Sequence, residues 1–238
     1  MSFTFKQFHL ADDQCAMKVG TDSILLGSWA DISSGDIATP RVLDIGCGSG
    51  LLSLMLAQRL EGKGQLVGIE IDREAVRQAR DNIRQSPWPE KITVVHSDIN
   101  GYVDGQKSDV IIANPPYFID SLRGPKLNRN TARHTDGLTQ QQLLDNVARL
   151  LAPDGVFYLI LPVNEAQQLM AKSEAAGLFL SHQCEVQTKA GKPASRCLMG
   201  FSKVAVAQIK HQNMVIYDEN NLYSSQFIAL TRNFYLNG

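Results

Sequence analysis

The sequence predicts an α/β fold, in which a doubly wound, mostly parallel sheet has helices on both faces and ends in a C-terminal antiparallel hairpin. Short apolar runs rich in Val and Ile recur along the chain, and such continuous apolarity is typical of strands buried on both faces. Helix-like segments separate these runs, as in successive βαβ units. Only a short segment with Gly and Pro separates the last two runs, which favours a hairpin turn.

The five expected parallel strands are each bounded by Gly, Pro, Asp or Asn, and they cover residues 41–45, 65–71, 92–96, 110–113 and 156–161. The expected helices between them cover residues 51–60, 73–85 and 138–151, with another after Pro162. Asp72 stands at the N-cap position of the helix at 73–85. The hairpin strands are expected at 184–188 and 195–202, and the C-terminal residues predict a turn at 217–221 and a short helix from Ser224.

The length of 238 residues predicts one domain rather than several. We expect residues 1–40 to form an N-terminal cap over the sheet, 41–205 to form the core, and 206–238 to form a C-terminal extension. Within the cap, residues 24–29 predict an amphipathic helix that lids the sheet. Residues 117–137 show no periodicity, and an irregular loop of this length is often functional.

Composition excludes several classes of protein. Hydrophobic residues make up 44% and charged residues 20%, which rules out collagen, coiled coils and wholly disordered chains. A net charge of −1 rules out a histone-like basic protein. The charge is unevenly distributed, however: residues 1–119 carry 11 basic and 15 acidic side chains, whereas residues 120–212 carry 11 and 7. This split hints at one face for a small cation and another for a polyanion.

Targeting signals and cysteine usage both point to the cytoplasm. The N-terminus lacks the basic and apolar regions of a signal peptide, and no apolar run approaches the length of a membrane span. The four cysteines form no C-x-x-C pair, so we expect reduced thiols, a cytoplasmic location and no membrane association.

A glycine-rich turn follows the first expected strand, in the run DIGCGSG at 44–50. Gly46, Gly48 and Gly50 would let the backbone approach a ligand closely and adopt positive φ. Their spacing differs from the G-x-G-x-x-G of dinucleotide sites, which place a pyrophosphate on a helix N-terminus. Asp44 instead suits a cofactor with positive charge, such as the sulfonium and ammonium groups of S-adenosylmethionine. We therefore expect this cofactor and no metal, and Cys47 is expected to pack rather than react.

Two acidic side chains follow the next strands. Glu70 ends the second strand, where an acid accepts hydrogen bonds from ribose hydroxyls in such folds. Asp72 is the competing candidate but is preferred as the helix N-cap. Asp98 follows the third strand, and it either accepts a bond from the exocyclic amine of the cofactor's adenine or is a plain loop carboxylate.

The most specific motif is Asn114-Pro115-Pro116-Tyr117, after the fourth strand. Its two prolines make the backbone rigid, so the Asn side-chain carbonyl and the Pro115 carbonyl can face the same way. Two acceptors suit a planar amino group, because they localise its lone pair and stabilise the positive charge that grows on nitrogen. Tyr117 can stack on the flat group and align it. The motif predicts methyl transfer to a planar nitrogen without a separate general base.

The ordered motifs DIGCGSG, GIEID, SD and NPPY resemble class I S-adenosylmethionine-dependent methyltransferases of the amino-methylating branch. The resemblance covers about residues 40–205 and implies a Rossmann-like, seven-stranded sheet with a final antiparallel strand. The segments 5–8, 17–29, 114–118 and 132–135 further resemble the bacterial tRNA adenine-N6 methyltransferases that modify the adenine beside the anticodon of a valine tRNA. This similarity spans nearly the whole chain and implies that Lys18 and Asp22 border the cofactor or substrate pocket.

The resemblance implies a role for the irregular loop in binding tRNA. Its stretch 123–133 holds four basic residues in eleven and no acid, and these side chains would grip tRNA phosphates near the anticodon loop. The expected substrate-binding residues are Arg123, Lys126, Arg129, Arg133 and His134. Lys189, Lys192 and Arg196 on the hairpin are candidates to extend this basic face. A plain solvated loop is the competing interpretation.

Other functions remain open at this stage. A protein glutamine N5-methyltransferase also acts on a planar nitrogen, but those enzymes resemble a chain with an extra N-terminal domain. DNA adenine-N6 and rRNA guanine-N2 methylation are further alternatives, and so is an RNA-binding module that has lost catalysis. The sequence suggests no obligate protein partner, and the preferred interpretation is an RNA adenine-N6 methyltransferase.

Overall fold

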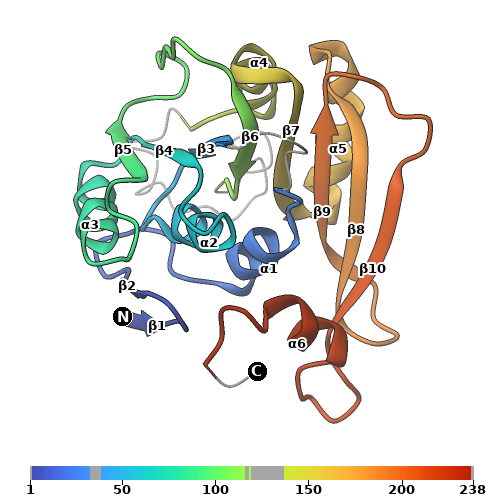
Figure 1. The fold of residues 1–238 in the computed structure, drawn as a ribbon. Helices are drawn as coiled ribbons and strands as arrows, with labels where there is room; N and C mark the ends of the chain where they lie inside the picture. The colour runs from blue at the N-terminus through green and yellow to red at the C-terminus, as the bar shows by residue number, and fades with distance from the viewer. Residues whose placement is uncertain (1, 33–38, 116–117, 119–136, 237–238) are drawn as a thin grey trace, which may run out of the picture.

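The structure is a computed structural model, and it describes residues 2–32, 39–115, 118 and 137–236. Its strands form a small hairpin and an eight-stranded sheet of order β10-β8-β9-β7-β6-β3-β4-β5 within this part of the chain (Figure 1). The hairpin consists of β1 (Ser2–Thr4) and β2 (His9–Ala11). The sheet comprises β3 (Arg41–Ile45), β4 (Gln65–Glu70), β5 (Ile92–His96), β6 (Ser108–Ala113), β7 (Leu151–Pro162), β8 (Phe179–Lys189), β9 (Ala194–Ser202) and β10 (Lys210–Tyr217).

The predicted fold class is confirmed. Strands β5, β4, β3, β6 and β7 are parallel, and β9 pairs antiparallel with both β7 and β8. These are the seven expected strands, and the expected hairpin is formed by β8 and β9. The eighth strand, β10, extends the sheet by pairing parallel to β8, with Met214 opposite Val186. No strand was expected at 210–217, because its first four residues are polar; in the structure these four are exposed.

The helices are α1 (Thr21–Trp29), α2 (Leu51–Arg59), α3 (Arg73–Arg84), α4 (Gln140–Leu150), α5 (Val163–Ser173) and α6 (Ser225–Thr231), with a 3₁₀ turn at Glu174–Ala176. Asp72 caps α3 as predicted, because its Oδ1 accepts from the backbone N–H groups of Glu74 at 2.8 Å and Ala75 at 2.9 Å. Thr139 and Gln142 form a capping box at the start of α4. Ser224 caps α6 by accepting from Phe227 N, as the expected helix start implied.

The expectation of an amphipathic helix at 24–29 is wrong. Residues 24–28 of α1 are all buried, so no polar face is left for solvent. Helix α1 packs against α2, α6 and β7, and a Cβ on Gly27 would lie 2.8 Å from Met55 Sδ. Because α1 is enclosed by neighbouring elements on several sides, it needs no polar face toward solvent, and the expected amphipathic pattern is absent.

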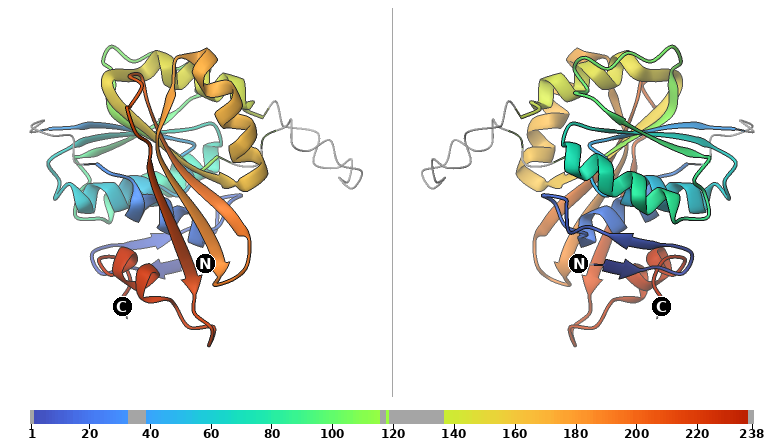
Figure 2. Two further views of the ribbon diagram at one scale, coloured as in Figure 1. Left: turned by 90° about the vertical axis from the view of Figure 1, so that its right-hand side faces the viewer. Right: turned by 90° about the vertical axis from the view of Figure 1, so that its left-hand side faces the viewer.

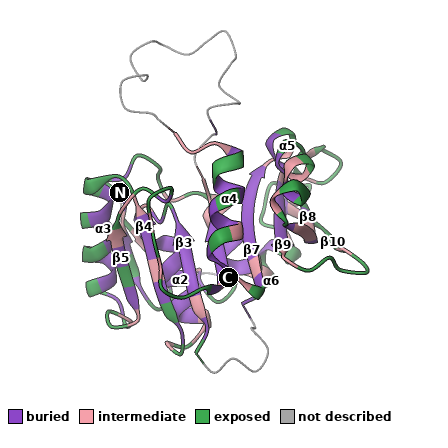
Figure 3. Cartoon of the chain, turned by 90° about the horizontal axis from the view of Figure 1, so that it is seen from above, coloured by how far each residue is buried: buried purple, intermediate pink, exposed green. Residues whose placement is uncertain are grey.

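Helices cover both faces of the sheet (Figures 2 and 3). One apolar cluster joins the sheet to α1, α2, α3 and α6, and a second joins its other face to α4 and α5. The two ends of the chain meet on the first side, where Lys6 N donates to Phe234 O at 2.9 Å and Gln58 Nε2 donates to Asn233 O at 2.7 Å. In the described ranges no helix is long and apolar enough to cross a membrane.

Candidate active site

The predicted site residues lie together at one edge of the sheet. Strands β5, β4, β3 and β6 are adjacent and parallel, so their carboxyl ends meet (Figure 1). In register, Ile45 lies opposite both Ile69 and Ala113, and Glu70 lies opposite His96. The glycine loop, Glu70, Asp98 and Asn114 therefore follow neighbouring strand ends. Ligands of open α/β sheets bind outside such ends.

The glycine loop leaves open space for a ligand. Gly46 and Gly48 have φ of 71° and 53°, and a Cβ added to either would meet nothing within 4 Å. The loop itself is fixed, because the N–H groups of Gly46 and Cys47 both donate to Ile69 O, at 2.8 and 3.0 Å. Gly50, at φ 84°, lies against α3, where a Cβ would be 3.5 Å from Ala79. The first two glycines thus face a cradle that side chains would fill, whereas the third serves helix packing.

Glu70 connects this loop to the end of β4. Its Oε2 accepts from Gly48 N at 2.9 Å, and its Oε1 accepts from Asp72 N at 2.9 Å. The residue is only half-buried, and each carboxylate oxygen can accept a further hydrogen bond. Its place beside the cradle fits the ribose hydroxyls of a nucleoside.

Asp44 lies beneath the loop, 1% exposed. Its Oδ2 accepts from Ser53 Oγ at 2.7 Å and Ser53 N at 3.1 Å, and its Oδ1 has no hydrogen-bond partner among the described residues. Burial raises the pKa of Asp44 to about 7, against the two Ser53 bonds, and the charge of Glu70 adds to the rise. A buried carboxyl with one unpartnered oxygen suits a cationic ligand, since a positive charge would favour its ionised form.

Asp98 and Cys47 occupy contrasting positions. Asp98 is exposed, and its Oδ1 accepts from Asn100 N and Nδ2, so it shapes the turn after β5. This geometry leaves open both interpretations of its role. Cys47 is buried against Gly68, and burial raises the pKa of its thiol well above the ordinary range. It packs, as expected, and is not an activated nucleophile.

Asn114 stands at the end of β6, half-buried, and its Nδ2 donates to Ser23 Oγ at 2.8 Å. Pro115 follows it, also half-buried, and Phe118 is buried in the core at 1% exposure. Pro116 and Tyr117 lie outside the described residues. The same holds for the basic positions Arg123, Lys126, Arg129, Arg133 and His134, so their expected roles stay predictions.

Lys18 precedes α1 and Asp22 lies in its first turn, and both side chains form contacts within the protein. Lys18 Nζ donates to Asp12 O at 2.8 Å and to Asp13 O at 3.2 Å. Asp22 Oδ2 accepts from Arg196 Nε at 2.8 Å, which ties α1 to the start of β9. These contacts explain how the segment is held, and whether either side chain also borders the cofactor stays a prediction.

Of the other basic hairpin positions, Lys189 is turned toward the C-terminal extension, where its Nζ donates to Glu219 O at 2.8 Å. Arg196, held by Asp22, is the hairpin cation that lies close to the candidate site.

Sequence reasoning missed three residues at this edge. Ser23 contacts Asn114, which lies 91 positions away in the sequence, and Ser53 binds Asp44 across nine positions; no periodic signal links either pair. Ile71 is 62% exposed between Glu70 and Asp72. The sequence could have indicated Ile71, because an apolar residue between two acids just after a strand offers a flat ligand a surface to pack on.

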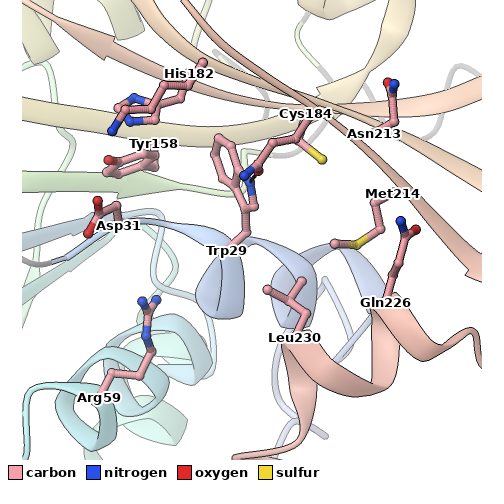
Figure 4. A pocket seen from close by; sticks show the side chains of 12 residues that line it. Trp29, Asp31, Arg59, Tyr158, His182, Cys184, Asn213, Met214, Gln226 and Leu230 are labelled. Carbon is pink, nitrogen blue, oxygen red and sulfur yellow. Dashed lines mark hydrogen bonds between the residues drawn. The ribbon is translucent and has the colours of Figure 1, made fainter.

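A separate cavity of about 680 Å³ lies where the other end of α1 meets β7, β8, β10 and α6 (Figure 4). Trp29 extends into it, 5.7 Å from the ring of Tyr158, and its Nε1 donates to Gln212 Oε1. None of the predicted site residues lines this cavity. It is therefore not part of the site at the strand ends. Among the described residues, no group of three or more His, Cys, Asp or Glu side chains is placed to hold a metal ion.

Comparison with known proteins agrees with this geometry. A family model described as a methyltransferase domain matches residues 38–221. A predicted O-methyltransferase from Agrobacterium tumefaciens superposes with a TM-score of 0.61 at 20% identity, covering 90% of this chain and 96% of that one. The glycopeptide N-methyltransferase MtfA complexed with S-adenosylmethionine gives a TM-score of 0.56 at 13% identity, covering 78% and 99%. At these identities, the two structures are similar in fold.

Sequence relatives are much more similar. The tRNA1(Val) (adenine(37)-N6)-methyltransferase of Tolumonas auensis is 46% identical over 99% of this chain and 97% of that protein. The protein of the same name from Phocaeicola vulgatus is 44% identical over the same shares. The chain therefore belongs to the S-adenosylmethionine-dependent methyltransferases and, within them, to the family of the tRNA1(Val) (adenine(37)-N6)-methyltransferases.

Proposed function

We propose that this enzyme transfers a methyl group from S-adenosylmethionine to the N6 amine of adenine 37, beside the anticodon of a valine tRNA. The observation that carries the reaction type is the oriented amide of Asn114, which stands at the strand edge that also holds the open glycine cradle. The identity of the nucleotide rests on full-length relatives that are 42–46% identical and bear this activity in their names.

The described residues fit the cofactor. The cradle at Gly46 and Gly48 accommodates a ligand against the backbone, and Glu70 would accept from its ribose hydroxyls. Exposed Ile71 would offer an apolar surface to an adenine ring, and the buried carboxyl of Asp44 would favour the positive charge of the cofactor. Asp98, Lys18, Asp22 and Asn114 complete the proposed cofactor set, and Gly50 supports the cradle by packing against α3. When bound, S-adenosylmethionine would supply the methyl group of its sulfonium: the S–CH₃ bond breaks as the N–CH₃ bond forms, and S-adenosylhomocysteine is left as the product.

The residues at the end of β6 act on the substrate amine. An exocyclic amine conjugated with a purine ring is a weak nucleophile, because its lone pair is delocalised. Asn114 Oδ1 and the Pro115 carbonyl would accept its two N–H protons, which localises the lone pair toward the methyl donor and stabilises the charge that forms on nitrogen. Tyr117 would stack on the base and, with Pro116, fix its plane. The amine proton then leaves to solvent, without a dedicated base.

The tRNA would be held beside this site by the loop with Arg123, Lys126, Arg129, Arg133 and His134. Its four Lys and Arg side chains follow the amine-binding motif directly in sequence. An anticodon loop is single-stranded, so its bases splay out at little cost and reach a pocket. We place the reaction in the cytoplasm, where buried free thiols such as Cys47 persist in reduced form.

The test supplies labelled S-adenosylmethionine to the wild type and to Asn114→Ala, with unmodified tRNA, duplex DNA and cell protein in competition. Products are digested and separated. We expect label in N6-methyladenosine from tRNA and a loss of at least about 100-fold with the substitution, since an oriented acceptor at the reacting atom is worth that much. Label in protein glutamine, in DNA, or in another nucleoside would overturn the proposal.

A further inference from the structure

The first turn of α1 lies against the end of β6, 91 positions away in sequence, through the hydrogen bond from Asn114 Nδ2 to Ser23 Oγ. Both side chains are half-buried. No described residue donates to Asn114 Oδ1, so the amide is held at its nitrogen end and its oxygen end is left to accept.

The orientation matters because the two ends of an amide have opposite hydrogen-bonding character. Rotation by 180° would place Nδ2, a donor, where Oδ1 now stands. The substrate amine presents N–H donors, so that rotated amide would set donor against donor. An unrestrained Asn side chain samples a broad range of its terminal torsion. A fixed partner at the nitrogen end keeps the amide plane in its productive orientation.

Ser23 is itself rigidly placed. The helix that carries it is buried from residue 24 to 28 and packs closely on α2 at Gly27. The neighbouring Asp22 forms an ion pair with Arg196 of β9 at 2.8 Å. The same helical turn is therefore bonded to two strands of the sheet, β6 through Ser23 and β9 through Asp22. A hydroxyl held this firmly can restrain the group that it contacts.

We propose that Ser23 is a positioning residue for methyl transfer, which acts by holding the amide of Asn114 with its oxygen toward the substrate amine. The proposal rests on the catalytic role proposed for Asn114 and adds a specific partner to it. The N-terminal segment would then help to orient the catalytic amide, in addition to covering the sheet.

The kinetic test compares Ser23→Ala, Ser23→Thr and Ser28→Ala. Ser28 is the matched control, because it lies in the same helix and its buried Oγ has no hydrogen-bond partner among the described residues. Ser23→Ala should lower kcat about 3- to 10-fold, as for loss of one hydrogen bond. KM for tRNA and for S-adenosylmethionine should stay within about 2-fold, since ground-state binding is not affected. Ser23→Thr keeps the hydroxyl and should restore kcat, and Ser28→Ala should match the wild type.

A second readout follows the amide directly. The side-chain NH₂ resonances of Asn114, identified by their loss in Asn114→Ala, should shift in Ser23→Ala and stay near their wild-type positions in Ser23→Thr and Ser28→Ala. A purely structural role would lower the stability of Ser23→Ala and raise both KM values together. Unchanged kcat and unchanged amide resonances in Ser23→Ala, alongside an inactive Asn114→Ala, would overturn this inference alone. A fully active Asn114→Ala would overturn the proposed function itself.

Discussion

Asp44 is fully buried beneath the glycine loop, where burial raises its pKa to about 7 from its ordinary value of 3.8. At pH values between these two pKa values, the folded chain therefore binds more protons than the unfolded chain. It follows that the contribution of this carboxyl to the free energy of unfolding is complete below about pH 4 and is lost as the pH rises through 7. The sequence predicted an acid here, but it gave no sign that Ser53 would bind it.

Asp44→Asn should remove this pH dependence. The side chain of the variant stays neutral at every pH. Between pH 4 and pH 8, the free energy of unfolding of the wild type should therefore fall by about 2–4 kcal/mol relative to that of the variant. Urea unfolding of the cofactor-free proteins across this range measures the difference. Parallel curves for the two proteins would show that Asp44 is ionised throughout.

The glycine loop and the caps are the elements that sequence predicts best, because their signals are local. The positive φ of Gly46 and the hydrogen bonds that Asp72 accepts from the first turn of α3 both follow from the residue type at one position. Helix α1 and strand β10 were predicted less well, since their character comes from distant partners. Burial of α1 on several sides, and the pairing of β10 with β8, depend on contacts that no short window of sequence contains.

Gly46→Ala should separate backbone strain from ligand contact when compared with Gly191→Ala. Both glycines have positive φ, 71° and 77°, and neither would place a Cβ within 4 Å of another atom. Each substitution should destabilise the fold by about 1–2 kcal/mol, as for L-residues in this conformation. Only Gly46→Ala should also weaken binding of S-adenosylmethionine, by at least about 10-fold, because its methyl group enters the cradle. Equal affinities by calorimetry would place the cofactor elsewhere.

Asp72→Ala tests the separate roles of Glu70, the last residue of β4, and Asp72, the N-cap of α3. Loss of its two cap bonds should lower the free energy of unfolding by about 1 kcal/mol, with little change in cofactor affinity. Glu70→Gln should have the opposite profile, with affinity reduced more than stability. Thermal unfolding and calorimetry on both variants check this pair. If Asp72→Ala weakened the cofactor more than Glu70→Gln, the roles would be reversed.

At the scale of the whole molecule, the order of the motifs along the chain predicted how they assemble. Parallel strands deliver their carboxyl ends to one edge, so the residues after β3, β4, β5 and β6 had to meet. The contacts that join the chain's two ends could not be predicted in this way. Lys6 N donates to Phe234 O through a pairing that follows no sequence pattern, and the same holds for the contact of Ser23 with Asn114 in the middle of the chain.

Phe234→Ala should show how far the C-terminal extension stabilises the fold. Phe234 is 1% exposed in the cluster that includes Phe5 and Phe8, whereas Leu236 is 57% exposed. Truncation of the buried ring should cost about 3–5 kcal/mol of unfolding free energy, and Leu236→Ala, the control, should stay within about 0.5 kcal/mol of the wild type. Similar losses from both variants in urea unfolding would mean that the extension packs differently.

The proposed role of the basic loop predicts how tRNA binding depends on salt concentration. Neutralising Arg123, Lys126, Arg129 and Arg133 together should weaken binding and reduce the slope of log affinity against log salt by about 2–3, because single-stranded phosphates release about 0.7 counterion per contact. Binding titrations at several salt concentrations measure the slope. An unchanged slope would assign the loop to solvent and leave tRNA contact to other surfaces.

The proposed function assigns the methylation of N6 of one adenine to the site at the end of β6. Its most direct measurement compares two transcripts of the valine tRNA, one with adenosine and one with guanosine at position 37, with labelled S-adenosylmethionine. We predict about one methyl group per adenosine-37 transcript, recovered as N6-methyladenosine, and none on the guanosine-37 transcript. Equal incorporation into both transcripts, or label on another nucleoside, would contradict this function.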